Sequence, residues 1–297
     1  MQIDPKRSLI GQPVEIVHPV EQTLPIVMAS PHSGRIYPDE FLAASQLNKL
    51  DIRRSEDSFV DEIFEPAVVR GAPLLIANFP RAYCDVNREP WEMDPAMFDG
   101  PLPGHANVKS IRVAGGLGTI ARVVSTGQQI YRDRLPVSEA ERRLRHYYRP
   151  YHAALSELVD QTMARFGTCL VVDCHSMPSA GLPRDRRRAP EQADIVLGDR
   201  FSTSCALDVT DFADRLLSGR GWRVVRNAPY AGGFCTSHYG RPSVGLHAMQ
   251  IEINRARYMN ERRFLRKEGI VQLAVDMADL IEQLGAAMPT AEQLAAE

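Results

Sequence analysis

The chain has 297 residues, of which 44% are hydrophobic and 24% are charged, and its 35 Lys and Arg against 37 Asp and Glu give a formal net charge of −2. This composition is typical of a globular protein and argues against a disordered, collagen-like or coiled-coil chain. It also argues against a bulk nucleic-acid binder, because a phosphate backbone requires a surplus of cationic side chains on one face.

Predicted strands and helices alternate along the chain. Short apolar runs indicate strands, and apolar residues spaced three and four apart indicate helices. This alternation favours an α/β fold, with a mostly parallel or mixed sheet flanked by helices, in a single domain that spans residues 1–297. In chain order, we expect strand 24–29, helix 58–69, strand 74–79, helix 138–166, strands 168–172 and 194–197, helix 207–217, strands 222–225 and 246–253, and helix 261–284.

Some segments depart from these regular patterns. Pro150 falls inside the helical pattern 138–166, where it removes a backbone donor, so we expect a kink or two helices there. The long segments 88–118, 176–193 and 227–245 fit neither period. Compact domains use such loops for binding, and in open parallel sheets the ligand crevice lies at the carboxyl ends of the strands.

The compartment follows from what the sequence lacks. No stretch reaches the roughly 18 uncharged apolar residues of a membrane span, and residues 1–10 lack the apolar block of a signal peptide. The five cysteines form no C-x-x-C pair, so we expect reduced thiols. We therefore expect a cytoplasmic protein with no membrane or nucleic-acid partner.

Two histidines stand where predicted strands end. His32 follows strand 24–29, and His175 follows strand 168–172. A histidine at one such place is ordinarily a hydrogen-bonded structural residue. Two of them at the carboxyl ends of strands in one parallel sheet favour metal ligation.

Glu56 and Asp57 form an acidic pair at the predicted start of helix 58–69. The ordinary interpretation is an N-cap, or a carboxylate that complements the helix dipole. The alternative is a metal ligand, because two imidazoles and one carboxylate with an open fourth position are the ligand set of a hydrolytic zinc site. The pattern of residues leaves both interpretations open.

Glu252 interrupts the apolar strand predicted at 246–253. A carboxylate is costly to bury without a partner, so Glu252 should pair with an arginine or face a polar site. Arg255 and Arg257 follow closely and supply the ion-pair interpretation. The functional interpretation is a general base for hydrolysis assisted by a metal.

Hydrogen-bonding side chains also cluster at 80–90, after strand 74–79. The planar fork of arginine suits bidentate binding of carboxylates, so Arg81 and Arg88 are candidates to bind an acidic substrate, together with Asn87. A structural role is the alternative for either arginine, and more so for Arg81.

With these groups assembled, the chain resembles the N-formylglutamate amidohydrolase family. The matching stretches span nearly the whole chain, and their order and number are more specific than any single histidine. They are PHSG at 31–34, EDSFVDEIF from 56, PRAYCDVNREP at 80–90, GQQIYRDRLP at 127–136, YYRPYH at 147–152, VVDCHSMPS at 171–179, and HYGRP through MQIEINRARYMNE at 238–261.

This resemblance implies a fold of the zinc carboxypeptidase and aspartoacylase type and a zinc-dependent amidohydrolase. Such an enzyme cleaves the formyl amide of N-formyl-L-glutamate to formate and L-glutamate, in histidine degradation. The resemblance also implies that His32, an acidic residue and His175 bind Zn²⁺ or another divalent ion. The wider superfamily has a glutamate three residues after its first histidine, where this chain has Arg35. We choose Asp57 over Glu56, because Asp57 matches the aspartate of the family's helix-start motif.

The same resemblance assigns roles to the remaining candidates. Glu252 matches a glutamate near the end of the family's last core strand and is expected to take the proton of the attacking water and deliver it to the departing nitrogen. Arg88, with Arg81 and Asn87, is expected to bind the carboxylates of a small acidic N-acyl amino acid. Two alternatives stay open: a hydrolase of another N-acyl acidic amino acid, such as N-formylaspartate, and a non-catalytic relative that binds a metal or ligand.

Overall fold

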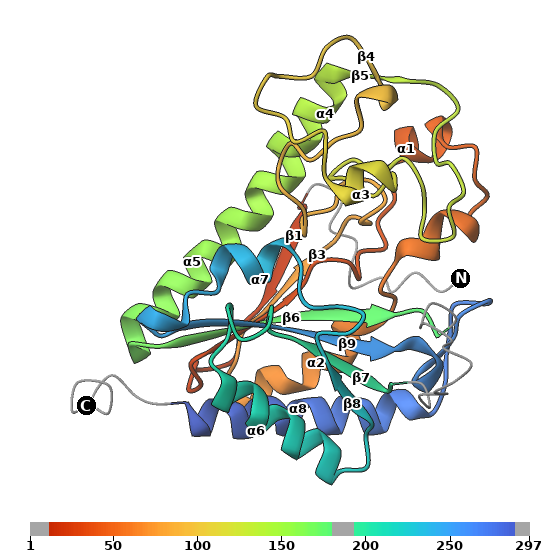
Figure 1. Ribbon diagram of the computed structural model, residues 1–297. Helices are drawn as coiled ribbons and strands as arrows, with labels where there is room; N and C mark the ends of the chain where they lie inside the picture. Colours follow the sequence, from red (N-terminus) through yellow and green to blue (C-terminus); the bar gives the residue numbers. More distant parts are fainter. Residues whose placement is uncertain (1–11, 180–192, 289–297) are drawn as a thin grey trace.

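A seven-stranded mixed sheet runs through the computed structural model, which describes residues 12–179 and 193–288 (Figure 1). Across the sheet, the strands are β1 (Val14–Val17), β3 (Leu74–Ala77), β2 (Ile26–Ser30), β6 (Cys169–Met177), β9 (Leu246–Asn254), β7 (Ile195–Gly198) and β8 (Val224–Arg226). The four neighbours β3, β2, β6 and β9 are parallel, whereas β1 and β7 run antiparallel to the strands beside them at either end of this group. This topology confirms the predicted mixed α/β sheet.

Helices cover both faces of the sheet (Figure 1). Side chains alternate between two apolar cores, so Val172 and Ile251 face one side, whereas Val171 and Ala248 face the other. The core around Val172 also contains side chains of α2 (Val60–Phe64), α6 (Leu207–Gly219) and α8 (Gly269–Ala287), and the core around Val171 contains side chains of α5 (Arg149–Phe166) and α7 (Phe234–Tyr239).

Shorter elements form the upper part of the molecule in Figure 1. They contribute buried side chains, such as Phe41 and Phe98, to the core around Val171. They comprise α1 (Asp39–Ala44), α3 (Ile111–Ala114), α4 (Val137–Arg143) and the two-stranded sheet of β4 (Phe98–Asp99) and β5 (Leu135–Pro136). Short 3₁₀ helices cover Asp51–Ser55, Glu65–Arg70, Pro95–Met97, Pro242–Val244 and Arg255–Arg257. Within the described residues, no helix is long and apolar enough to cross a membrane.

All six predicted strands are confirmed, with one consequential difference in length. The strand predicted at 168–172 is β6, which continues to Met177. His175 therefore lies inside a strand, and its side chain points to the face opposite Cys174, which is buried in the other core. The half-buried edge strand β1 was not predicted.

Two predicted helices are interrupted where proline occurs. The pattern 138–166 forms α4 and α5 with a π-helical turn at Leu144–Tyr148 between them, directly before Pro150 in the first turn of α5. The altered hydrogen-bond spacing of a π turn accommodates the backbone N–H that proline lacks. The helix predicted at 58–69 is α2 followed by a 3₁₀ turn, and Pro66 lies at the start of that turn.

The helix predicted at 261–284 begins later in the structure, at Gly269. Residues before Gly269 instead form a hairpin of β10 (Met259–Asn260) and β11 (Leu265–Arg266), and the helix is α8. The Asn260 side chain accepts the backbone N–H groups of Arg262 and Arg263, which favours a turn. Phe264 has a left-handed backbone with φ of 52°, so its match to the helical spacing was accidental.

The three long loops differ in what they contain. The loop 88–118 contains β4, α3 and a 3₁₀ turn, and the loop 227–245 contains α7, none of which was predicted. In the third loop, 176–193, residues 180–192 lie outside the described part of the chain.

Candidate metal centre

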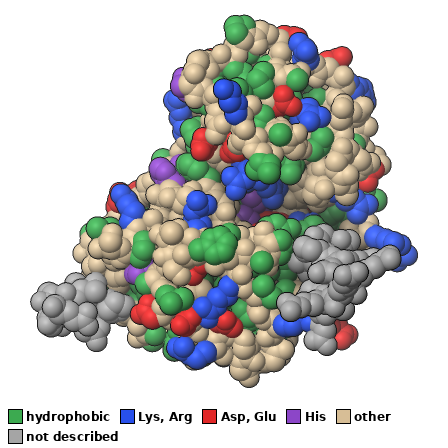
Figure 2. Space-filling model, viewed as in Figure 1, with side chains coloured by type: hydrophobic (Ala, Val, Ile, Leu, Met, Phe, Trp, Pro, Cys, Tyr) green, Lys and Arg blue, Asp and Glu red, His purple; other side chains and the backbone are tan. Residues whose placement is uncertain are grey.

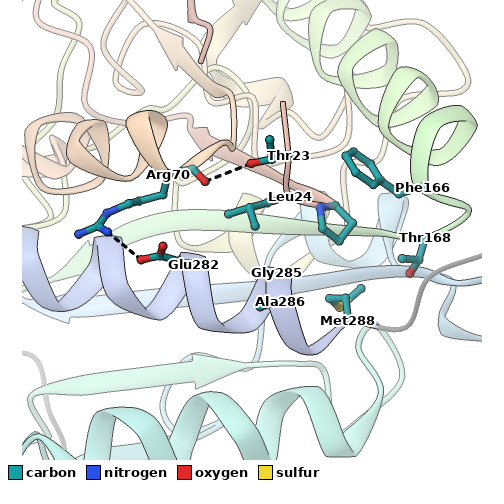
Figure 3. A pocket seen from close by; sticks show the side chains of 10 residues that line it. Thr23, Leu24, Arg70, Phe166, Thr168, Glu282, Gly285, Ala286 and Met288 are labelled. Atoms are coloured by element: carbon teal, nitrogen blue, oxygen red, sulfur yellow. Dashed lines mark hydrogen bonds and ion pairs between the residues drawn. The ribbon is translucent and has the colours of Figure 1, made fainter. Parts of the chain in front are cut away.

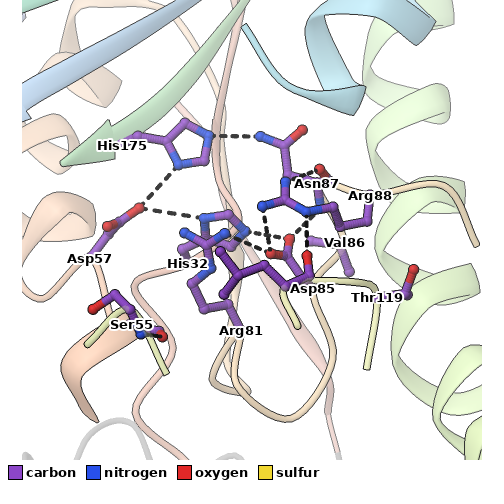
Figure 4. Close-up of polar contacts among 12 residues, drawn as sticks. His32, Ser55, Asp57, Arg81, Asp85, Val86, Asn87, Arg88, Thr119 and His175 are labelled. Carbon is purple, nitrogen blue, oxygen red and sulfur yellow. Dashed lines mark hydrogen bonds and ion pairs between the residues drawn. The ribbon is translucent and has the colours of Figure 1, made fainter. Parts of the chain in front are cut away.

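His32, Asp57 and His175 converge at the carboxyl edge of the parallel strands (Figure 4). Oδ2 of Asp57 lies 3.0 Å from Nδ1 of His175 and 3.4 Å from Nδ1 of His32. One potential ligand atom from each of the three side chains lies within 4.8 Å of the others, and all three residues are buried. These are the three residues that the sequence analysis chose as metal ligands.

Backbone contacts fix this convergence. His32 stands in the turn after β2, and its carbonyl accepts the N–H of Asp57 at 3.0 Å. The turn can press against the end of β3 only because Gly34 lacks a side chain, since a Cβ there would lie 2.2 Å from the carbonyl oxygen of Phe79. His175 is held by the β6 ladder itself.

Each imidazole turns its other nitrogen toward a buried carboxylate. Nε2 of His32 hydrogen-bonds Oδ1 of Asp85 at 2.8 Å. Nε2 of His175 lies 2.9 Å from Oδ1 of Asp173 and also 2.9 Å from the side-chain nitrogen of Asn87. In the tautomer with a proton on each Nε2, each Nδ1 has a lone pair, and both Nδ1 atoms face Asp57. Carboxylate partners of this kind orient the histidine ligands of metals.

The cluster therefore fits a cation. Within the described residues, Nδ1 of His32 is buried without a hydrogen-bond partner. Two imidazole lone pairs and a carboxylate oxygen repel one another unless a positive charge lies between them. Two nitrogen ligands and one oxygen ligand suit Zn²⁺ and other divalent transition metals.

Asp57 and Glu56 point in different directions. Oδ1 of Asp57 accepts from Arg255 Nη2 at 2.8 Å and from Ser176 Oγ at 3.1 Å, while Oδ2 faces the histidines. Burial favours a higher pKa for Asp57, but its contacts with His175, His32 and Arg255 outweigh burial and hold the pKa well below its usual range. The Glu56 carboxylate instead accepts two bonds from Arg53, at 2.9 and 2.8 Å.

Glu252 lies beside the cluster on the neighbouring strand. It is the register partner of His175 in the parallel β6–β9 pair, so both side chains leave the same face of the sheet. Burial raises the pKa of Glu252 to about 7. Arg255 hydrogen-bonds Asp57, and Arg257 pairs with Asp194. Among the described residues, neither arginine forms an ion pair with Glu252, in contrast to the ion-pair interpretation.

The candidate substrate residues differ in how many of their hydrogen-bonding groups already have a partner in the protein. Nε of Arg88 donates to the carbonyl of Leu117 at 2.9 Å, and Nη1 of Arg88 donates to the carbonyl of Asn87 at 2.7 Å. Asn87 donates to Asp173 at 2.8 Å and accepts the N–H of Cys235 at 2.7 Å. Arg81 makes a single hydrogen bond within the described residues, to Asp85 at 2.6 Å. Of the two arginines, Arg81 therefore has more N–H groups without a hydrogen-bond partner among the described residues, although the sequence analysis placed Arg88 first.

Three polar residues of the site were not singled out from the sequence. Asp173 and Gln250 each stand two positions before a chosen residue on the same strand, and the Gln250 amide donates to Oε1 of Glu252 at 2.8 Å. The period of two along a strand was a usable signal for both. Asp85 lies in the irregular segment 80–90, where no period indicates its direction.

The raised pKa of Glu252 predicts a pH effect on the metal-free protein. The pKa of Glu252 is about 7 in the folded chain, against the ordinary value of 4.5 that applies when the chain is unfolded. Between pH 4.5 and pH 7 the folded chain therefore binds the proton more tightly, and the free energy of unfolding falls as pH rises through this window. We expect metal-free Glu252→Gln to have a higher melting temperature than the metal-free wild type at pH 8, and an equal one near pH 5. An identical difference at both pH values in thermal unfolding would contradict this assignment.

One cavity of the described structure lies away from the cluster. A cavity of about 480 Å³ opens at the opposite edge of the sheet, where Leu24 precedes β2 and Thr168 precedes β6 (Figure 3). Arg70 and Glu282 form an ion pair at its wall. In Figure 2, basic and histidine side chains instead meet in a recess between the upper and lower parts of the molecule.

Fold and cluster together define an α/β protein with a candidate metal centre at the carboxyl edge of its sheet. Residues 24–259 match the model of N-formylglutamate amidohydrolase. The chain therefore belongs to the N-formylglutamate amidohydrolase family, as its resemblance had indicated.

Curated relatives and a solved structure agree with this membership. The chain is 28% identical over 244 residues to an N-formylglutamate deformylase of Pseudomonas aeruginosa, covering 80% of this chain and 84% of the relative. It is 26% identical over 264 residues to an N-formylglutamate deformylase of Pseudomonas putida, covering 84% and 87%. A crystal structure of N-formylglutamate amidohydrolase from Ralstonia eutropha JMP134 is 37% identical, with a TM-score of 0.87, over 93% of this chain and 98% of that one.

Proposed function

We propose that the chain is a metal-dependent amidohydrolase that cleaves the formyl amide of N-formyl-L-glutamate to formate and L-glutamate, in histidine degradation. The family, and the names of the relatives described above, support this substrate. The observation that carries the proposal is the position of Glu252 beside His175, next to a buried His–Asp–His cluster.

Three side chains of this cluster would hold the metal, which we propose to be Zn²⁺ or another divalent ion. Nδ1 of His32, Nδ1 of His175 and Oδ2 of Asp57 are the ligand atoms. When bound, such an ion would lower the pKa of a water toward about 7 and polarise the formyl oxygen.

Glu252 performs the proton transfers in this proposal. Its carboxylate takes a proton as the water oxygen bonds to the formyl carbon, and it returns that proton to the amide nitrogen as the C–N bond breaks. The products are formate and the free amine of glutamate. A pKa of about 7 suits a group that must both accept and release a proton near neutral pH. The bond from Gln250 holds one oxygen of this carboxylate in place.

Arg81 binds a carboxylate of the substrate. Its side chain is 22% exposed, and one of its N–H groups is bonded to Asp85. The electrostatic neighbours of its guanidinium include Asp57 and Glu252, so the guanidinium lies near the cluster. The remaining N–H groups of its planar fork are suited to a bidentate bond with a carboxylate.

Formate release tests the proposal. We expect the metal-loaded chain to release formate from N-formyl-L-glutamate, and expect a chelator to abolish this activity and added divalent metal to restore it. N-acetyl-L-glutamate and N-succinyl-L-glutamate serve as size controls. Faster cleavage of either analogue would replace the proposed substrate with another N-acyl acidic amino acid. No release from any of them, with metal bound, would favour the non-catalytic alternative.

A further inference from the structure

Asp85 touches both a candidate metal ligand and the candidate substrate arginine. It is buried, with 3% of its surface exposed. Oδ1 accepts from Nε2 of His32 at 2.8 Å and from the N–H of Asn87 at 2.9 Å. Oδ2 accepts from Nη2 of Arg81 at 2.6 Å (Figure 4). A buried carboxylate held at both oxygens has little freedom to turn.

Asp173 provides an internal comparison. Its Oδ1 lies 2.9 Å from Nε2 of His175, and the side-chain nitrogen of Asn87 lies at the same distance from that Nε2. Its other oxygen accepts from the amide of Asn87 at 2.8 Å. Among the described residues, no arginine forms an ion pair with Asp173. Both carboxylates therefore lie beside Nε2 of a candidate metal ligand, and of the two only Asp85 also pairs with an arginine.

The second partner of Asp85 is the arginine with open donors. Arg88 also approaches Oδ2 of Asp85, at 3.6 Å, but two of its nitrogens already donate to backbone carbonyls. Of these partners, Arg81 makes the shortest contact with Asp85, at 2.6 Å.

We propose that Asp85 is a positioning residue that couples binding of the substrate carboxylate at Arg81 to the placement of His32 in the metal centre. This inference rests on the proposed function. Through Oδ2, Asp85 fixes the guanidinium so that its free N–H groups face the site, and through Oδ1 it fixes the imidazole tautomer that presents Nδ1 to a metal. One side chain therefore sets both the metal site and the substrate site.

Three matched substitutions test this coupling. Asp85→Asn keeps an oxygen for His32 but places an amide donor against Arg81. Asp173→Asn alters the support of His175 and the bond from Asn87, and leaves the contact between Asp85 and Arg81 intact. Asp276→Asn removes a carboxylate that bonds Trp222 and Arg220. Metal affinity is measured without substrate, by competition with a chromogenic chelator. KM for N-formyl-L-glutamate is then measured at saturating metal.

We expect metal affinity to fall by roughly 10–100-fold in Asp85→Asn and Asp173→Asn, and to stay unchanged in Asp276→Asn. KM should rise by roughly tenfold in Asp85→Asn alone, because a charge-assisted bond to the arginine is lost. Arg81→Met should raise KM strongly in the wild type and only weakly in the Asp85→Asn background.

Two results would overturn the coupling. One is an unchanged KM in Asp85→Asn, as in Asp173→Asn, and the other is an equal effect of Arg81→Met in both backgrounds. Failure of the proposed function gives a different result, a wild-type chain that binds metal but releases no formate. That outcome would remove the substrate half of this inference, whereas the chelator titrations would still decide the half that concerns His32.

Discussion

Replacing Glu252 with glutamine will lower kcat for N-formyl-L-glutamate by about 10²–10⁴-fold, the range typical of a lost general acid or base. Glutamine has nearly the shape of glutamate and can still contact Gln250, but it cannot take a proton from water or return one to the leaving nitrogen. The register partner of Glu252 is His175, yet the candidate ligand atoms belong to His32, Asp57 and His175 themselves. Metal content should therefore stay at the wild-type level.

The measurements are formate release under steady-state conditions and metal content of the purified protein by elemental analysis. Glu139→Gln is the matched control, because Glu139 pairs with Arg142 and Arg143 in α4, outside the site. It should retain wild-type turnover. Full turnover in Glu252→Gln would exclude Glu252 as the proton carrier, and loss of metal in that variant would make Glu252 part of the metal site.

Periodicity explains why much of the fold and part of the site could be predicted. Each strand of the parallel group is an apolar run, and its side chains alternate between two cores. On β6 the residues that face the second core are apolar up to Val171 and then become polar, as Asp173 and His175. On β9 the same change occurs between Ala248 and Gln250. A strand that becomes polar on one face near its carboxyl end indicates a site.

The direction of a side chain in an irregular segment depends on contacts from elsewhere in the chain, so the sequence could not rank such residues. Arg81 and Arg88 lie seven positions apart in one loop, and only the distant carbonyl of Leu117 shows that Arg88 is largely occupied. Phe264 illustrates a second kind of error. Its spacing predicted a helix, but the residue lies between β10 and β11, and its buried ring packs against a cation. The guanidinium carbon of Arg53 lies 4.6 Å from the centre of its ring.

Glu56 and Asp57 give the sharpest case, because they are adjacent carboxylates that local pattern cannot separate. Asp57→Asn should reduce metal affinity by more than the roughly 10–100-fold expected for a lost outer partner, and turnover should fall with it. The reason is that the amide removes the negative charge between two imidazole lone pairs. It also leaves Arg255 without its carboxylate partner at 2.8 Å.

Glu56→Gln is the control one residue away, and its expected defect is of another kind. The Glu56 carboxylate accepts from Arg53, from Ser58 at 2.6 Å and from Tyr37 at 3.1 Å, and none of these partners is a candidate ligand. Removing one partner of a buried ion pair costs about 3–5 kcal/mol, so thermal unfolding should shift to lower temperature while the folded protein keeps its metal. Both variants are compared by metal stoichiometry at a temperature where each is folded. Asp57 and Glu56 face different partners, so the two variants separate their roles. Stoichiometric metal in Asp57→Asn, or loss of metal from folded Glu56→Gln, would contradict Asp57 as the ligand and favour Glu56.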